Sequence, residues 1–165
     1  MDPTIGFIGL GTMGGPMAQR LISAGYKVVG YDRRLEAVAS CPGLHPAESA
    51  LECTTAADIL LTSLPRPDHV ESLMCDDGVL DVLSEKQIWV DLTTNRRDTL
   101  LAWSADTPAS IVDCPVTGAV DGARNGKLTL FAGGATEVLD RVEPVLSHLG
   151  RVIRCGALGL SLIHI

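Results

Sequence analysis

Short apolar runs alternate with longer segments of helical pattern along most of the chain. Uninterrupted apolar runs are typical of strands that are buried on both faces of a sheet. The sequence predicts such strands at 4–9, 27–32, 59–65, 88–92, 109–116 and 127–134. The connections between them are long enough to hold helices, so the strands are expected to run parallel.

Helix signals fill the intervening segments. Residues 13–25 predict a helix with Gly25 just past its end, and 135–150 predict an amphipathic helix closed by Gly150. Within 46–58, Ser49 and Glu52 have the spacing of a capping box, and a helix over 67–74 starts at Pro67. The stretch RVIRCG ends the ordered pattern. The fold class is therefore α/β: a doubly wound, mainly parallel sheet with helices on both faces.

Composition narrows the class of protein. A chain of 165 residues, 46% hydrophobic but only 4% aromatic, predicts one soluble domain with an aliphatic core. The formal net charge of −7 argues against nucleic acid or an anionic membrane as partner, and no apolar run approaches membrane-spanning length. Five cysteines without a C-x-x-C pair are typical of reduced, mostly buried thiols, which favours a cytoplasmic location; no metal site is indicated.

The first strand is followed by a glycine pattern. Gly9, Gly11 and Gly14 match G-x-G-x-x-G between a predicted strand and a predicted helix, which is the context of a dinucleotide-binding loop rather than an ordinary tight turn. Gly9 would allow the turn, Gly11 the approach of a pyrophosphate, and Gly14 the packing of helix on strand. The predicted cofactor-binding residues of this loop are Gly9, Leu10, Gly11, Thr12, Met13 and Gly14.

The end of the second strand bears on the choice of cofactor. A carboxylate at Asp32 would accept hydrogen bonds from the adenosine ribose and repel a 2′-phosphate, which favours NAD. Arg33 and Arg34 follow directly, and a guanidinium could bind that phosphate, so NADP is possible. Alternatively, the arginines begin a solvated helix, a reading that we favour for Arg34.

The opening segment and three further stretches resemble the β-hydroxyacid dehydrogenases, the group of 3-hydroxyisobutyrate dehydrogenase, tartronate semialdehyde reductase and 6-phosphogluconate dehydrogenase. The stretches are SLPRPDHV (63–70), VDLTTNRRDT (90–99) and DCPVTGAVDGARNGKLTLFAGG (113–134). The chain departs from the family pattern at four positions, with Thr93 and Thr117 for serine, Arg97 for proline and Ala119 for glycine. The resemblance implies a Rossmann-like fold and an NAD(P) cofactor.

The resemblance also implies roles for residues outside the glycine loop. Leu64, Pro65 and Thr94 would lie at the nicotinamide end of the cofactor. Thr94 is as well suited to capping the next helix. Thr117, Gly118 and Ala119 would hold a substrate carboxylate, unless they form only a glycine-rich turn. Asp113 is interpreted as a strand-end residue that orders this loop.

By resemblance, the function is hydride transfer between a nicotinamide cofactor and a short-chain 3-hydroxy acid, as in 3-hydroxyisobutyrate dehydrogenase, by a protein that forms a homo-oligomer at full length. The alternatives are an NADPH-dependent glyoxylate or succinic semialdehyde reductase of the same family and a non-catalytic dinucleotide-binding module. We expect residues 1–159 to form the NAD(P)-binding Rossmann domain. The family's catalytic lysine and its helical C-terminal domain would follow Gly159, so the chain carries no predicted catalytic residue. LSLIHI (160–165) matches a translated sequencing adapter and is expected to be a non-native tail.

Overall fold

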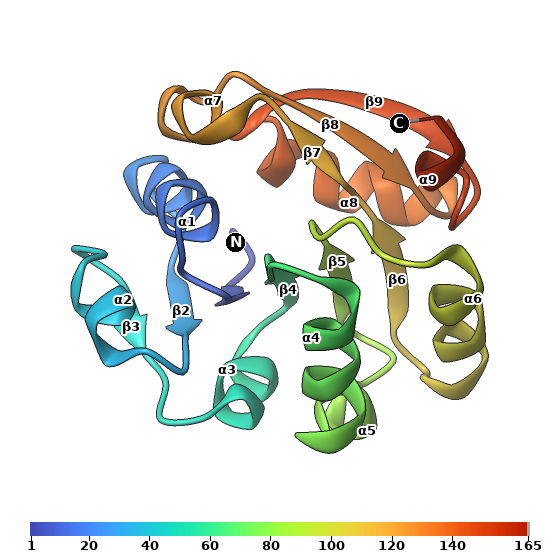
Figure 1. The fold of residues 1–165 in the computed structure, drawn as a ribbon, viewed down its shortest axis with the longest axis horizontal. Helices are drawn as coiled ribbons and strands as arrows, with labels where there is room; N and C mark the ends of the chain where they lie inside the picture. Colours follow the sequence, from blue (N-terminus) through green and yellow to red (C-terminus); the bar gives the residue numbers. More distant parts are fainter. Residues whose placement is uncertain (165) are drawn as a thin grey trace.

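The computed structural model describes residues 1–164; Ile165, the last residue of the expected tail, lies outside the described residues. One mixed sheet crosses the molecule in the order β3-β2-β1-β4-β5-β6-β8-β7, with β9 beside β8 (Figure 1). Its strands are β1 (Ile5–Ile8), β2 (Val28–Tyr31), β3 (His45–Pro46), β4 (Ile59–Thr62), β5 (Ile88–Asp91), β6 (Ser110–Asp113), β7 (Val116–Thr117), β8 (Leu128–Gly133) and β9 (Gly150–Gly156).

Helices cover both faces of this sheet, as the sequence predicts. One face carries α1 (Gly14–Ser23), α2 (Leu35–Ala39), α7 (Ala119–Asn125) and α8 (Thr136–Leu146). The other carries α3 (Ala50–Ala56), α4 (Pro67–Glu71), the π-helix η1 (Ser72–Asp76), α5 (Val79–Val82) and α6 (Arg97–Asp106). A short helix, α9 (Ser161–His164), lies against β8 and β9. The two layers of helices are separated by the strands in Figure 1.

Alternate residues of each central strand supply the two apolar cores. Phe7, Leu61 and Val90 point to the α1 and α8 side, whereas Leu60 and Trp89 point to the α3 and α6 side. All five side chains are fully buried. Because both faces are covered, the strand sequences are apolar throughout instead of alternating with polar residues.

The direction in which strands are added to the sheet reverses between β1 and β4. From β1 the chain adds β2 and β3 on one side, then crosses to β4 and adds β5 and β6 on the other, all parallel. In open α/β sheets, ligands bind outside the carboxyl ends of the strands at such a switch point. The fold therefore directs attention to the loops that follow Ile8 and Thr62.

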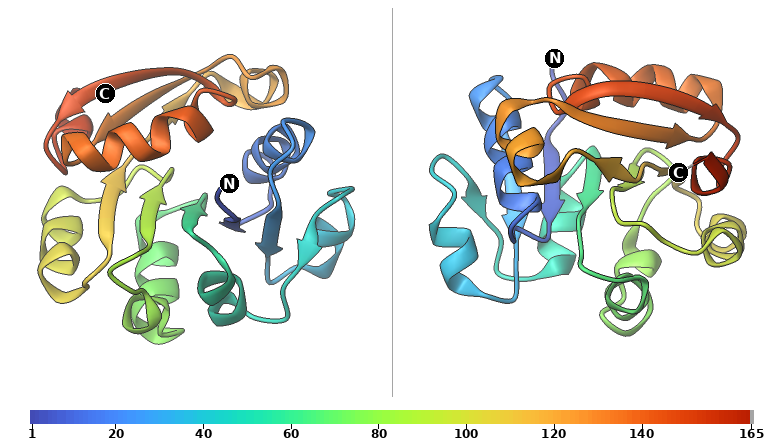
Figure 2. Two further views of the ribbon diagram at one scale, coloured as in Figure 1. Left: turned by 180° about the vertical axis from the view of Figure 1, so that it is seen from behind. Right: turned by 45° about the horizontal axis from the view of Figure 1, so that its top comes forward.

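The later part of the chain departs from the sequence-based prediction. The helix predicted over 135–150 ends at Leu146, and Gly150 starts β9 instead of closing the helix. A Cβ at Gly150 would overlap the Leu128 carbonyl, so the glycine serves the close approach of β9 to β8. The stretch RVIRCG is thus a paired strand, and β8 runs antiparallel to β6 and β7 but parallel to β9. Figure 2 shows α8 alongside this part of the sheet.

Two helix-end predictions are confirmed. Gly25 has φ +97°, its N–H donates to Ile22, and the N–H of Tyr26 donates to Leu21, which is the double hydrogen bond of a Schellman motif. At the start of α3, the Ser49 hydroxyl accepts from the Glu52 N–H at 3.1 Å. The reciprocal bond comes from the N–H of Glu48, not of Ser49.

Cysteine burial agrees in part with the prediction of mostly buried thiols. Cys41, Cys53 and Cys114 are buried, whereas Cys155 is half-buried and Cys75 is exposed. Burial raises the pKa of the Cys53 thiol to about 12, so this group stays protonated at neutral pH. Over residues 1–164, none of the helices has the length and apolar character needed to cross a membrane.

Candidate functional site

The glycine loop lies at the switch point, between the end of β1 and the start of α1. Gly9 has φ +95°, and a Cβ there would overlap the Ser63 carbonyl that follows β4. A Cβ at Gly14 would overlap the Gly9 carbonyl, so only glycine lets the helix start this close to the strand. The turn and packing roles predicted for these two glycines are therefore confirmed by the geometry.

Gly11 has a different surrounding. A Cβ there would meet only the Nη2 atom of Arg34, at 3.2 Å, and no other atom within 4 Å. The backbone is therefore open on this side, as the approach of a pyrophosphate requires. Of its neighbours, Leu10 is buried, Met13 is half-buried against the core and Thr12 is exposed. The residues present fit a dinucleotide at this loop.

Asp32 connects the end of β2 to the glycine loop. One carboxylate oxygen accepts from the Leu10 N–H at 2.8 Å, and the other accepts from the Arg34 N–H at 2.9 Å and from Arg34 Nε at 3.4 Å. The Asp32 side chain is only 12% exposed. Its position at the strand end beside Leu10 is the one that a ribose-binding carboxylate requires.

The two arginines after Asp32 take different directions. Arg33 pairs with Asp77 at 3.1 Å, beyond the end of η1. Arg34 is the N-cap residue of α2 (Leu35–Ala39) and its side chain is 58% exposed, so the reading that it begins a solvated helix is confirmed. Its guanidinium also lies over Gly11 and beside Asp32. Arg34 is thus the arginine that lies next to the glycine loop. The sequence alone does not show which of the two adjacent arginines takes this position.

On the other side of the switch point, Leu64 and Pro65 continue β4. The Leu64 side chain is half-buried and lies 3.0 Å from where a Cβ of Gly9 would be, and Pro65 is exposed. The Leu64 N–H donates to Thr93 Oγ1 at 3.0 Å. The structure therefore brings the glycine loop, the 64–65 segment and the turn after β5 together.

Beneath that turn lies a buried polar cluster that sequence analysis missed. Asp91 is fully buried; its carboxylate accepts from Thr62 Oγ1 at 3.0 Å, from the Thr93 N–H at 3.1 Å and from Asn95 Nδ2 at 2.9 Å. Burial raises the pKa of Asp91 to about 6, although the three donors oppose this rise. The sequence signal that could have indicated this cluster is the polar residue at the end of each of two apolar strands, Thr62 and Asp91.

Thr94 itself is exposed at this turn. The alternative reading as a helix cap is wrong, because α6 begins only at Arg97 and its capping position is Arg96. The exposed hydroxyl remains available on the ligand side. A role in holding the nicotinamide end stays a prediction.

The predicted substrate residues Thr117, Gly118 and Ala119 join β7 to α7 and are all exposed. Gly118 has φ +132°, and Ala119 adopts φ +57°, the left-handed region where the resembling family has glycine. The helix that follows this motif, α7, packs on α1, which is the helix that follows the glycine loop (Figure 1). The motif is thus a glycine-rich turn that leads into a helix. Whether it also holds a substrate carboxylate stays a prediction.

Asp113 ends β6 and is 1% exposed. Its Oδ1 accepts from the Gly159 N–H at 2.6 Å, whereas Oδ2 is buried without a hydrogen bond in residues 1–164. Burial raises the pKa of Asp113 to about 6. The interpretation as a residue that orders a loop holds, but the loop is the segment after β9 and not the 114–118 segment.

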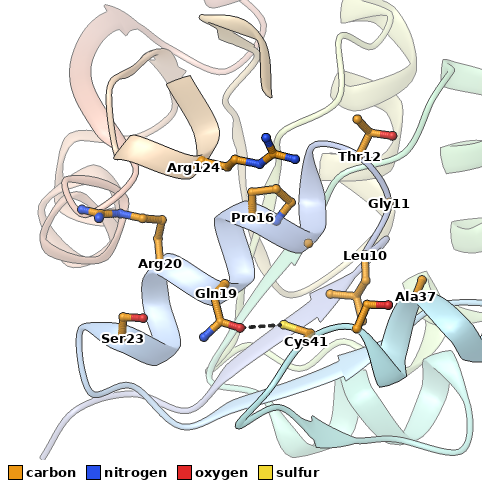
Figure 3. A pocket seen from close by; sticks show the side chains of 12 residues that line it. Leu10, Gly11, Thr12, Pro16, Gln19, Arg20, Ser23, Ala37, Cys41 and Arg124 are labelled. Atoms are coloured by element: carbon orange, nitrogen blue, oxygen red, sulfur yellow. Dashed lines mark hydrogen bonds between the residues drawn. The ribbon is translucent and has the colours of Figure 1, made fainter. Parts of the chain in front are cut away.

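A groove of about 620 Å³ adjoins the glycine loop between α1 and α2. It includes Leu10, Gly11 and Thr12 but none of the other predicted site residues. Gln19 and Cys41 face one another across it, and Arg124 extends from α7 over Pro16 (Figure 3). Leu64 and Thr94, at the predicted nicotinamide end, are not among the residues that line this groove.

Comparison with known proteins agrees with this geometry. The family described as the NAD binding domain of 6-phosphogluconate dehydrogenase matches residues 4–159. Over 155 residues the chain is 39% identical to 3-hydroxyisobutyrate dehydrogenase of Pseudomonas aeruginosa and 34% identical to the NAD-dependent L-serine dehydrogenase of the same organism. Each alignment covers 90% of this chain and 52% of the relative, so the chain spans about half the length of these curated relatives.

Among solved structures, 3-hydroxyisobutyrate dehydrogenase of Mycobacterium tuberculosis with L-serine superposes with a TM-score of 0.92 at 32% identity. The match covers 99% of this chain and 58% of that one. The family match includes every motif from the glycine loop to Gly159, and the fold agrees over the same residues. The chain therefore belongs to the family of nicotinamide-cofactor-binding Rossmann domains found in the β-hydroxyacid dehydrogenases.

Proposed function

We propose that this chain is the cofactor-binding part of an NAD(H)-dependent dehydrogenase that oxidises a short 3-hydroxy acid, with 3-hydroxyisobutyrate as the first substrate to test. The observation that carries the proposal is the pairing of the open backbone at Gly11 with the Asp32 carboxylate beside Leu10. The loop would hold the pyrophosphate by its backbone N–H groups and by the dipole of α1. These groups bind an anion without lysine side chains, so the net negative charge of the chain does not prevent binding. Asp32 would accept from the ribose hydroxyls.

The remaining predicted residues have roles toward the reacting end. Leu64 and Pro65 would contact the nicotinamide side of the cofactor, and the exposed Thr94 hydroxyl would hydrogen bond there. Thr117, Gly118 and Ala119 would present a hydroxyl and backbone N–H groups to the substrate carboxylate. When bound, the cofactor supplies the hydride acceptor at its nicotinamide ring.

The chemistry of the relatives' named substrates supports the substrate class. 3-Hydroxyisobutyrate and L-serine each carry a hydroxymethyl group on the carbon next to a carboxylate. One site that binds the carboxylate would then bring the same C–H bond toward the cofactor. Binding of 3-hydroxyisobutyrate and L-serine tests this substrate class, with isobutyrate and L-alanine, which lack only the hydroxyl, as the controls.

Cofactor preference tests the proposal directly on this chain. We expect tighter binding of NADH than of NADPH by calorimetric titration, because the Asp32 carboxylate repels a 2′-phosphate. Asp32→Asn removes the charge but keeps an oxygen that can accept from the Leu10 N–H. The difference between the NADH and NADPH affinities should therefore become smaller. Equal or tighter binding of NADPH by the unaltered chain would contradict the proposal.

A specific observation favours a second candidate, an NADPH-dependent semialdehyde reductase of the same family. Arg34 lies beside Asp32 and over Gly11, where its guanidinium could donate hydrogen bonds to a 2′-phosphate. Arg34→Ala should then weaken NADPH and leave NADH unchanged. Arg33→Ala is the matched control, because Arg33 pairs with Asp77 instead. If Arg33→Ala alone weakens binding, the assignment of Arg33 as a cofactor residue is favoured over Arg34.

The activity is best measured on the product of the intact gene, since the chain spans about half the length of its relatives. NADH formation from 3-hydroxyisobutyrate and from L-serine, and NADPH consumption with succinic semialdehyde, distinguish the two candidates. Homo-oligomerisation stays a proposal. A cytoplasmic location also stays a prediction, and one relative in Arabidopsis thaliana is named as mitochondrial.

A further inference from the structure

A chain of hydrogen bonds joins the ends of β4 and β5 beneath the switch point. Trp89 Nε1 donates to Thr62 Oγ1 at 2.9 Å, and the same hydroxyl donates to Asp91 at 3.0 Å. Asp91 holds the turn above it through the Thr93 N–H and the Asn95 side chain. Thr93 Oγ1 then accepts from the Leu64 N–H. The chain therefore begins in the core and ends on a loop at the candidate site.

This buried polar arrangement costs free energy compared with apolar packing of the same volume, which indicates a role beyond packing. Thr62 and Asp91 have no exposed surface, and Thr93 and Asn95 are only 7% and 8% exposed. Burying a carboxylate carries a desolvation penalty that apolar side chains of similar size would avoid. Buried polar groups that are fully hydrogen-bonded specify one arrangement of the backbone around them. Here the specified arrangement is that of the 63–65 and 92–95 segments.

The Leu64 N–H is the critical donor of this arrangement. Ser63 N–H is bound to the Ile8 carbonyl on the β1 side, and Leu92 N–H to the Thr62 carbonyl. Pro65 has no N–H, so Leu64 provides the last backbone donor by which this loop can be tied to the β5 side. The side-chain hydroxyl of Thr93 is its acceptor. Without this bond, the backbone N–H groups of residues 63–65 would hold the segment only to β1, through Ser63.

We propose that Asp91 and Thr93 are positioning residues that hold the Leu64–Pro65 segment against the turn after β5, so that both stay placed for the nicotinamide end of the cofactor. This inference rests on the proposed function, and it adds two buried residues that contact neither cofactor nor substrate. It predicts that the adenine half of the site, built from the glycine loop and Asp32, does not depend on the cluster.

Comparison of NADH with ADP-ribose isolates the contribution of the nicotinamide ring to binding, because ADP-ribose lacks only that ring. Thr93→Val preserves side-chain volume but leaves the half-buried Leu64 N–H without its acceptor. We expect Thr93→Val to weaken NADH binding about tenfold and to leave ADP-ribose binding within about twofold. Thr93→Ser, which keeps the hydroxyl, should restore NADH binding. The measurement is calorimetric titration of the 165-residue chain.

Two further variants keep the test decisive. Thr54→Val is the matched control, since the buried Thr54 hydroxyl donates within α3 to the Ala50 carbonyl, away from the site. It should change neither affinity. Should Thr93→Val fail to fold, Asp91→Asn tests how Asp91 holds the turn after β5, because the new amide nitrogen would face the Asn95 amide while the remaining oxygen still accepts from Thr62 and from the Thr93 N–H. It should likewise weaken NADH selectively.

The outcomes separate this inference from the proposed function. Equal weakening of NADH and ADP-ribose would assign Thr93 a structural role only, and an unchanged NADH affinity would remove the role altogether. Either result overturns the positioning of the loop. If the unaltered chain binds neither ligand, the proposed function fails and this inference fails with it.

Discussion

At the scale of single residues, Ala119 is the clearest departure from ordinary backbone geometry. Among residues 1–164 it alone, apart from glycines, has a positive φ, at +57°. The left-handed conformation costs an L-residue roughly 1–2 kcal/mol because Cβ approaches the following carbonyl. Ala119 is exposed, so no packing of its methyl group compensates this cost.

Replacing this residue should therefore stabilise the protein. Ala119→Gly is expected to raise the free energy of unfolding by about 1 kcal/mol, since glycine adopts this conformation without strain. Ala102→Gly, at an exposed position within α6, should lower it by a similar amount. Urea unfolding of both variants measures the difference. A destabilised Ala119→Gly would mean that the methyl group makes a contact that outweighs the strain.

Individual residue roles were predictable where chemistry and position coincide. Gly9, Gly14 and Asp32 have contacts that follow from a loop between strand and helix. Arg33 and Arg34 are adjacent and chemically identical, and only the course of the backbone after β2 directs one to Asp77 and the other to Gly11. That course depends on packing, which no local sequence pattern encodes.

At the scale of elements, helix ends set by local hydrogen bonds were predicted better than those set by packing. Ser49 and Gly25 act on their own helices. Gly150 follows a segment of helical pattern, yet its small size serves β8, a strand that lies about twenty residues earlier. The prediction of α8 failed at its end because the deciding contact is with another element.

The cap of α3 has a measurable effect. Ser49→Ala removes the acceptor of the Glu52 N–H and should lower the free energy of unfolding by about 1 kcal/mol. Thr55→Ala in the same helix removes an exposed hydroxyl that donates to the Glu52 carbonyl, and it should have a smaller effect. Thermal unfolding followed by circular dichroism compares them. Equal losses would show that the cap adds nothing beyond surface hydrogen bonding.

At the scale of the whole molecule, the carboxyl ends of the parallel strands form one row. The register aligns Thr62, Asp91 and Asp113 across β4, β5 and β6. The sequence predicts each strand but not this alignment, because register is set by pairing between segments distant in the chain. The buried polar cluster therefore became visible only in three dimensions.

The two aspartates in this row make stability depend on pH. Burial raises the pKa of Asp91 and of Asp113 from 3.8 to about 6, so the folded state holds these protons more tightly than the unfolded state does. Between those values the free energy of unfolding falls as pH rises. Asp113→Asn should remove its share of this fall, giving a flatter profile between pH 4 and about 6.5 in denaturant titrations. A variant profile as steep as the original would contradict the assignment.

The bond from Leu64 to Thr93 also has a dynamic consequence. Amide protons in loops normally exchange with solvent deuterium quickly, because they are exposed or open easily. The Leu64 proton is held by a hydroxyl that is itself buried and tied to Asp91 through its own backbone. Its exchange should be slow, at a rate close to that of the neighbouring β4 amides, although it lies outside any strand. The loop would then open only together with the turn after β5, as one cooperative unit.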